Sequence, residues 1–93
     1  MSEDSNAPDD EAIRARLQAG DVAGAVDGVY RRYARDLRAF LRDQLWSDDA
    51  VDEVLAELFK SLMHDLAGFR GDAKLRTWLR TVARHAMLQY LKR

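Results

Sequence analysis

Residues 49–66 read DAVDEVLAELFKSLMHDL, and their apolar side chains recur at steps of three and four. This spacing is typical of an amphipathic α-helix whose apolar stripe faces a core. The stripe consists of Val51, Val54, Leu55, Leu58, Phe59, Leu62, Met63 and Leu66. The break at Trp46-Ser47-Asp48 supplies the start, since Ser47 or Asp48 can accept hydrogen bonds from the first free backbone amides. An apolar stripe this wide must be buried against other helices, so the segment predicts a helical bundle.

The chain before this helix predicts a second long helix, over about residues 22–45, and a short one over about residues 10–19. The core face of the long helix is predicted to be Val26, Val29, Tyr30, Tyr33, Leu37, Phe40, Leu41 and Leu45. Its opposite side carries arginines and aspartates, which we interpret first as a solvated face with local ion pairs. In the short helix Ile13 and Leu17 share a face, and Gly20 is expected to end it.

The chain after residue 66 predicts a loop and a last helix. Gly68 is expected to end the preceding helix, and Asp72 to cap a helix over about residues 73–92. This helix is predicted to bury Leu75, Trp78, Leu79, Val82, Ala86 and Tyr90. With no strand pattern in the sequence, the predicted fold class is all-α, with three longer helices around one core and a short helix in front.

Composition bounds the organisation and the chemistry. Ninety-three residues, 47% of them hydrophobic, predict one small domain over residues 10–93, preceded by an acidic, disordered segment over residues 1–9. The absence of Cys excludes disulfides and thiolate metal sites, and His64 and His85 are too far apart to suggest zinc, so no metal or cofactor is expected. No apolar run approaches the ~18 residues of a membrane span. We expect a cytoplasmic protein without a membrane or a small-molecule partner.

Charge is unevenly distributed along the chain. The 15 Lys+Arg and 16 Asp+Glu nearly cancel, yet residues 67–93 hold seven of the basic side chains and one of the acidic ones. Arg76, Arg80 and Arg84 follow one another at four-residue steps, about 6 Å apart along a helix, a spacing that can track the phosphates of a nucleic acid. A solvated face that complements the helix dipole is the other interpretation, and the pattern alone leaves both open.

The segment FRGDAKLRTWLRTVARHAMLQYLKR, residues 69–93, resembles the second half of region 2 of extracytoplasmic-function (ECF) sigma factors of bacterial RNA polymerase. Members of that family typically read close to F-x-G-x-x-x-x-x-T-W-L-x-x-I-A-R. The residues that match are Phe69, Gly71, Thr77, Trp78, Leu79, Ala83 and Arg84, with Val82 in place of Ile. Upstream, VYRRYARDLRAFLRDQL and DEVLAELFKSL resemble the two preceding helices of the family, so the resemblance covers about residues 10–93.

The resemblance implies a transcription initiation factor with two binding surfaces. One docks on the clamp helices of the polymerase β′ subunit; by position it comprises Asp52, Glu53, Ala56 and Glu57. The other recognises and opens the −10 element of a promoter, capturing a flipped base of the non-template strand in a loop. The loop would be lined by Phe69, Arg70, Gly71, Asp72, Ala73 and Lys74. The helix positions facing DNA would be Arg76, Thr77, Arg80, Arg84, His85 and Gln89.

Three positions depart from the family pattern: Ala56 replaces a usual Gln, His85 a usual Asn, and Gln89 a usual Asp. Family members continue into region 4, which is absent from this sequence, and they are commonly held by an anti-sigma factor. The alternative function is a sigma-like protein–protein interaction module without DNA recognition. An enzyme is not expected, because no carboxylate pair, nucleophile–base arrangement or phosphate loop stands out.

Overall fold

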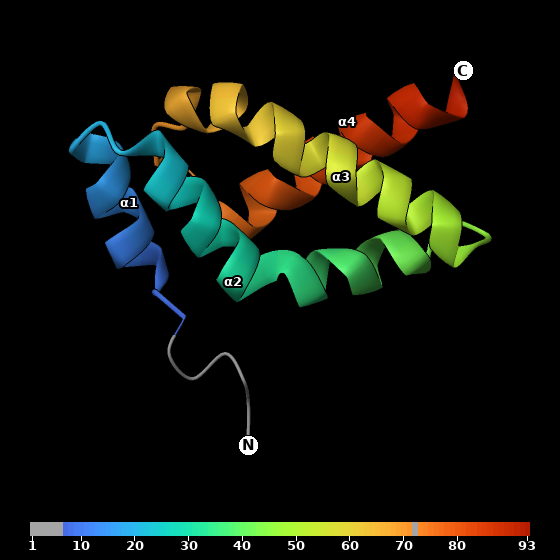
Figure 1. The fold of residues 1–93 in the computed structure, drawn as a ribbon, viewed down its shortest axis with the longest axis horizontal. Coiled ribbons are helices and arrows are strands. Elements are labelled where there is room, and N and C mark those ends of the chain that lie inside the picture. Colours follow the sequence, from blue (N-terminus) through green and yellow to red (C-terminus); the bar gives the residue numbers. More distant parts are fainter. Residues whose placement is uncertain (1–6, 72) are drawn as a thin grey trace.

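The computed structural model describes residues 7–71 and 73–93. The elements are α1 (Asp10–Gln18), α2 (Val22–Arg42), α3 (Asp48–Asp65), the short 3₁₀ helix η2 (Leu66–Gly68) and α4 (Leu75–Leu91). In Figure 1, α2 and α3 form an antiparallel pair joined at one end, α1 lies beside the start of α2, and α4 crosses behind α3. Because α4 packs on both α2 and α3, the three long helices enclose one core, as the all-α prediction requires.

The helix starts follow from capping side chains. Asp9, Asp21 and Ser47 each accept a hydrogen bond from the backbone amide three residues further on, and so begin α1, α2 and α3. Of the two caps predicted for α3, Ser47 is the one that forms. Gly20 has a φ of +83°, a left-handed conformation that favours glycine and separates α1 from α2 as predicted.

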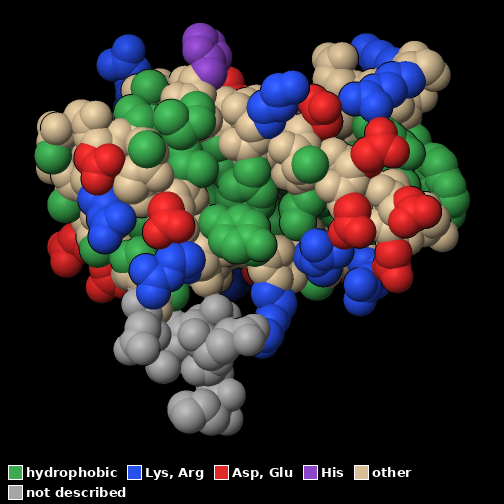
Figure 2. All heavy atoms as spheres, viewed as in Figure 1, with side chains coloured by type: hydrophobic (Ala, Val, Ile, Leu, Met, Phe, Trp, Pro, Cys, Tyr) green, Lys and Arg blue, Asp and Glu red, His purple; other side chains and the backbone are tan. Residues whose placement is uncertain are grey.

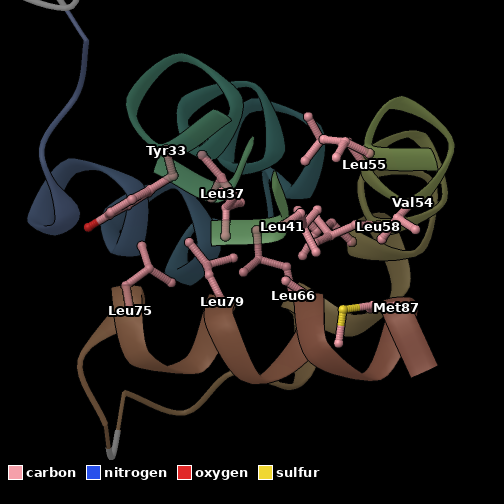
Figure 3. Packing of buried hydrophobic residues seen from close by; sticks show 14 of the residues in the cluster. Tyr33, Leu37, Leu41, Val54, Leu55, Leu58, Leu66, Leu75, Leu79 and Met87 are labelled. Carbon is pink, nitrogen blue, oxygen red and sulfur yellow. The ribbon is translucent and has the colours of Figure 1, made fainter. Parts of the chain in front are cut away.

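The core is built from the apolar stripes of all four α-helices. Figure 3 shows Leu75, Leu79 and Met87 projecting from α4 into the core, toward residues of α2 and α3 such as Leu37, Leu41 and Leu58. The largest side chains that are fully buried are Ile13, Leu37, Leu41, Leu58, Leu62, Leu66, Leu75, Leu79, Val29, Val51 and Val54. These positions are those of the predicted stripes, so the periodicity located most of the core correctly.

Two predicted core residues lie on the surface instead. Tyr30 is 57% exposed and Met63 is 50% exposed. The Tyr30 ring contacts Phe59 edge-on, with 5.2 Å between centroids, and Figure 2 shows hydrophobic side chains gathered on the surface between α2 and α3. Both residues lie at the edge of a stripe, where burial depends on how closely the neighbouring helix approaches.

Two helix boundaries also differ from prediction. α2 ends at Arg42, although Leu45 beyond it remains buried through a turn in which the Leu45 amide donates to the Leu41 carbonyl. α4 begins at Leu75, where the backbone of Lys74 is extended and its side chain forms no cap. The predicted cap, Asp72, lies outside the described residues.

The α1–α2 contact involves the end of the segment expected to be disordered. A Cβ atom added at Gly28 would lie 3.0 Å from Ile13 and 3.1 Å from Pro8, so a glycine permits this close approach. Arg32 lies 3.2 Å from the Asp10 carboxylate, to which the Tyr33 hydroxyl also donates. Burial, together with that hydrogen bond, raises the pKa of the Tyr33 hydroxyl. Residues 1–6 of the segment lie outside the described part.

Candidate nucleic-acid and protein interfaces

The outer face of α4 carries the predicted row of arginines. Arg76, Arg80 and Arg84 are all exposed, one helical turn apart. A shallow hollow of about 330 Å³ lies on this face. It is lined by Thr77, Arg80, Thr81, Arg84 and His85. The helix therefore brings four of the predicted DNA-facing residues into one concave strip of cationic and hydrogen-bonding groups.

Asp36 of α2 faces two of these arginines. Its Oδ1 lies 3.3 Å from Nη2 of Arg80, which donates to it, and its Oδ2 lies 3.8 Å from Nε of Arg76. The guanidinium of Arg80 also lies 5.5 Å from the centroid of the Phe40 ring, a cation–π contact. Two cations of the row thus pair with a carboxylate of α2 while their side chains remain exposed.

The loop before α4 is anchored by an aromatic pair. Phe69 is half-buried, and its ring centroid lies 5.1 Å from that of Trp78. Trp78 itself packs against the core, as predicted, and is only partly accessible. Gly71 has a φ of +82°, which turns the chain away from Phe69. Leu75 then returns the chain to the core, where it is fully buried.

A small pocket of about 140 Å³ lies between this loop and α1. Its lining residues are Arg14, Leu17, Gln18, Phe69, Arg70 and Gly71. Three of these were predicted as loop residues of the site. The other predicted loop positions, Ala73 and Lys74, are exposed, while Asp72 lies outside the described residues.

Arg14 is a site residue that the sequence did not reveal. Its guanidinium lies 5.7 Å from the centroid of the Phe69 ring, and its Nη2 donates to the carbonyl of Ala73 at 3.5 Å. Its Nε is buried and has no hydrogen-bond partner among the described residues. Nothing in the local sequence distinguishes Arg14 from Arg16. The two contacts of Arg14 cross from α1 to a loop more than fifty residues further along the chain, and local sequence does not predict such contacts.

The predicted polymerase-binding positions share the exposed side of α3. Asp52, Glu53, Ala56 and Glu57 are all accessible, and the carboxylates lie in the amino-terminal half of the helix, toward the positive end of its dipole. Their charges are partly compensated from neighbouring helices. Arg38 of α2 pairs with Asp52 and donates to it.

Arg93, beyond the end of α4, pairs with the other two acids. Its Nη1 lies 3.1 Å from Glu53 and its Nη2 lies 3.7 Å from Glu57. The same guanidinium lies 5.4 Å from the centroid of the Tyr90 ring. The ion pairs of these acids therefore connect α3 with α2 and with the end of the chain beyond α4.

The two predicted surfaces meet at a groove of about 480 Å³ between α3 and α4. From α3 it is lined by Glu57, Ser61 and Asp65, with Gly68 at one end. From α4 it is lined by Trp78, Val82, His85, Ala86, Gln89, Tyr90 and Arg93. Glu57 of the acidic surface thus shares a groove with His85 and Gln89 of the α4 surface.

The described residues form neither a metal-binding cluster nor a membrane-spanning helix. No group of three or more His, Cys, Asp or Glu side chains in residues 7–71 and 73–93 is arranged to hold a metal ion. Within the same part of the chain, no helix combines the length and apolar character required to cross a membrane. The arrangement offers exposed cations, hydrogen-bonding groups and carboxylates, which are suited to binding charged partners.

Comparisons with known proteins point to one family. A family model described as sigma-70 region 2 matches residues 29–93. The chain is 26% identical over 69 residues to RNA polymerase sigma factor YlaC of Bacillus subtilis, a match covering 74% of this chain and 40% of that protein. It is 31% identical over 86 residues to ECF RNA polymerase sigma factor SigM of Mycobacterium tuberculosis, strain Erdman, covering 89% of this chain and 44% of that protein. The chain therefore spans less than half the length of these relatives. No solved structure gives a significant match.

Proposed function

Because the chain belongs to the sigma-70 region 2 family, we propose that it acts in transcription initiation, docking on bacterial RNA polymerase and recognising the −10 element of a promoter. ECF sigma factors are among its relatives, which supports this assignment. The function consists of binding two macromolecules, and it requires no catalytic residue. Polymerase would be bound through α3, and the non-template strand through α4 and the preceding loop.

The observation that carries the DNA-binding part is the exposed row on α4. Arg76, Arg80 and Arg84 span about 12 Å of helix axis, so that they can contact successive phosphates of one strand. Thr77, His85 and Gln89 supply short hydrogen-bonding groups beside them, which suits contacts to base edges. Phosphate contacts would position the strand, and the neutral groups would discriminate between bases.

The loop supports capture of an unstacked base. Phe69 is fixed by Trp78 and Arg14, so the pocket between the loop and α1 has a rigid apolar wall. Arg14, Arg70 and Gln18 bring polar groups to its rim. A flipped base needs both an apolar surface to stack on and hydrogen-bonding groups at its edge. Trp78 packs against the core and is only partly accessible, which favours a structural role over that of a wedge between bases.

The acidic side of α3 supports docking on a cationic protein surface. Asp52, Glu53 and Glu57 are exposed together, and Ala56 between them leaves room for an approaching side chain. Arginines of a partner would have to compete with Arg38 and Arg93 for these carboxylates. Exposed ion pairs contribute little stability, about 0–1 kcal/mol, so such an exchange is feasible.

The test is a fluorescence-anisotropy titration of labelled single-stranded −10-like oligonucleotides at two salt concentrations. The native chain should bind selectively, and Arg80→Ala/Arg84→Ala should bind more weakly, with a salt slope reduced by about 0.7 for each phosphate that the variant no longer neutralises. Arg42→Ala/Lys60→Ala is the matched control, because it removes two exposed cations from α2 and α3 and leaves α4 intact. It should bind like the native chain.

Equally weakened binding by both double variants would mean that only net charge matters, and α4 would not be the reading surface. If the native chain binds no oligonucleotide selectively, a sigma-like protein-interaction module is the better description. A pull-down with the β′ clamp helices then separates that module from an inactive chain. Charge reversal at Glu53 and Glu57 should abolish capture in either case.

A further inference from the structure

Asp36 occupies an unusual place relative to the proposed DNA-binding row. It comes from α2, forty and forty-four residues before the two α4 arginines that it faces. Its two oxygens are divided between them, Oδ1 toward Arg80 and Oδ2 toward Arg76. A carboxylate between two guanidinium groups one turn apart occupies the position that a phosphate bridging the same two groups would take.

The third arginine of the row differs in this respect. Within residues 7–71 and 73–93, Arg84 takes part in no ion pair. Two of the three arginines are therefore neutralised in part by Asp36, and the third is not. Phosphate binding at Arg84 releases no internal partner, whereas binding at Arg76 and Arg80 must displace or approach a fixed carboxylate.

The environment of Asp36 makes that displacement unfavourable. Its side chain is only 28% exposed, and its Oδ2 is buried and accepts no hydrogen bond from the described residues. If Arg80 turned toward a phosphate, the carboxylate would lose its hydrogen-bonding cation while remaining partly desolvated. It would also repel the phosphate, since both groups are anionic.

We propose that Asp36 is a built-in competitor for DNA phosphates at Arg76 and Arg80, and that it lowers the affinity of the free domain for single-stranded DNA. This inference rests on the proposed function of α4. Its consequence is a lower affinity for every single strand: a strand that makes only phosphate contacts is held weakly, and base contacts from the loop and from His85 are needed for stable binding. Because all strands carry the same phosphates, the penalty lowers the affinity for a specific strand and for any other strand by the same factor.

The test adds Asp36→Asn and Asp36→Ala to the anisotropy titration, with a −10-like strand and a scrambled strand. Both variants should bind the scrambled strand about two- to fivefold more tightly at low salt, as expected for the removal of one partly exposed ion-pair competitor. Their salt slope should steepen by about 0.7, corresponding to one additional phosphate contact. The −10-like strand should gain affinity by the same factor, so that the ratio of the two affinities stays unchanged.

Asp27→Asn is the matched control. Asp27 is exposed on the same helix, makes no ion pair among the described residues, and its replacement changes net charge by the same amount. It should bind both strands like the native chain. Circular dichroism and urea unfolding of each variant establish that the compared proteins are folded.

Each outcome has a definite meaning. Tighter binding of both strands by both Asp36 variants but not by Asp27→Asn supports the proposal. If the Asp36 variants bind DNA no more tightly than the native chain, while Arg80→Ala in the native chain still reduces affinity, the role of Asp36 is overturned and the proposed function stands. If neither the native chain nor any Asp36 variant binds either strand, the proposed function fails and this inference fails with it.

Discussion

Replacing Leu79 with alanine should strongly destabilise the bundle, because α4 contributes its inner face to the shared core. Leu79 is fully buried, and Figure 3 shows it directed toward the interior beside Leu75 and opposite α2. The proposed DNA-binding arginines of the same helix are exposed on its outer face. A core substitution at Leu79 therefore perturbs packing without removing any group of the proposed binding surface.

The magnitude follows from the atoms removed. Leucine to alanine deletes three carbon atoms, about 2.4 kcal/mol at about 0.8 kcal/mol for each buried methylene. The cavity left behind adds to this, so that buried leucines typically lose about 2–5 kcal/mol on replacement by alanine. About 3 kcal/mol is a large share of the 5–15 kcal/mol expected for a small domain. It corresponds to a fall in Tm on the order of 10–20 °C.

Urea unfolding followed by far-ultraviolet circular dichroism, which reports helix content, measures this destabilisation through the transition midpoint. Leu88→Ala is the matched control, since Leu88 lies on the same helix but is 46% exposed. It should lose less than about 1 kcal/mol. Equal destabilisation at the two positions, or a change below about 1 kcal/mol at Leu79, would refute the packing of α4 described above.

Two further predictions concern the loop and the α1–α2 contact. Gly71→Ala should lower the free energy of unfolding by about 1–2 kcal/mol, because the φ of +82° at Gly71 is unfavourable for a residue with a Cβ. Gly68→Ala is the control: a Cβ at Gly68 meets no neighbouring atom and its φ is not positive, so the substitution should be nearly neutral in the same urea assay. The raised pKa of Tyr33 means that its contribution to stability is present below the ordinary tyrosine pKa of about 10 and is lost as pH rises through the higher folded value. The unfolding free energy should therefore fall in alkaline solution, and Tyr33→Phe should flatten that fall; an unchanged alkaline slope in the variant would contradict the assignment.

The sequence predicted the helices well where local chemistry decides the outcome. Ser47 as a cap and Gly20 as a stop are properties of a few neighbouring residues, and both were found where expected. The fully buried leucines of α3 and α4 could be predicted from their spacing alone, because an apolar stripe along one side of a helix must face the core. The family resemblance was confirmed by the match over residues 29–93.

The errors arise where a second helix decides the outcome. Tyr30 and Met63 have the spacing of core residues, yet they lie at the margins of their stripes, where the neighbouring helices leave about half of each side chain exposed. The pairing of Asp36 with Arg80 and the contact of Arg14 with Phe69 join residues from different helices or loops. Such partners depend on crossing angles and on rotamers, which the spacing of residues along one helix does not specify.

The two ends of the loop before α4 have a consequence for how such a protein can diverge. Phe69 is held by Trp78, and Leu75 is fully buried, so the core fixes both ends of the segment between them. The exposed residues Arg70, Ala73 and Lys74 within it contribute little to folding. Substitutions at these exposed positions therefore change the stability of the fold little, whereas Gly71 is constrained by its positive φ. Under the proposed function, duplicated copies of such a chain can acquire separate promoter preferences while keeping one scaffold.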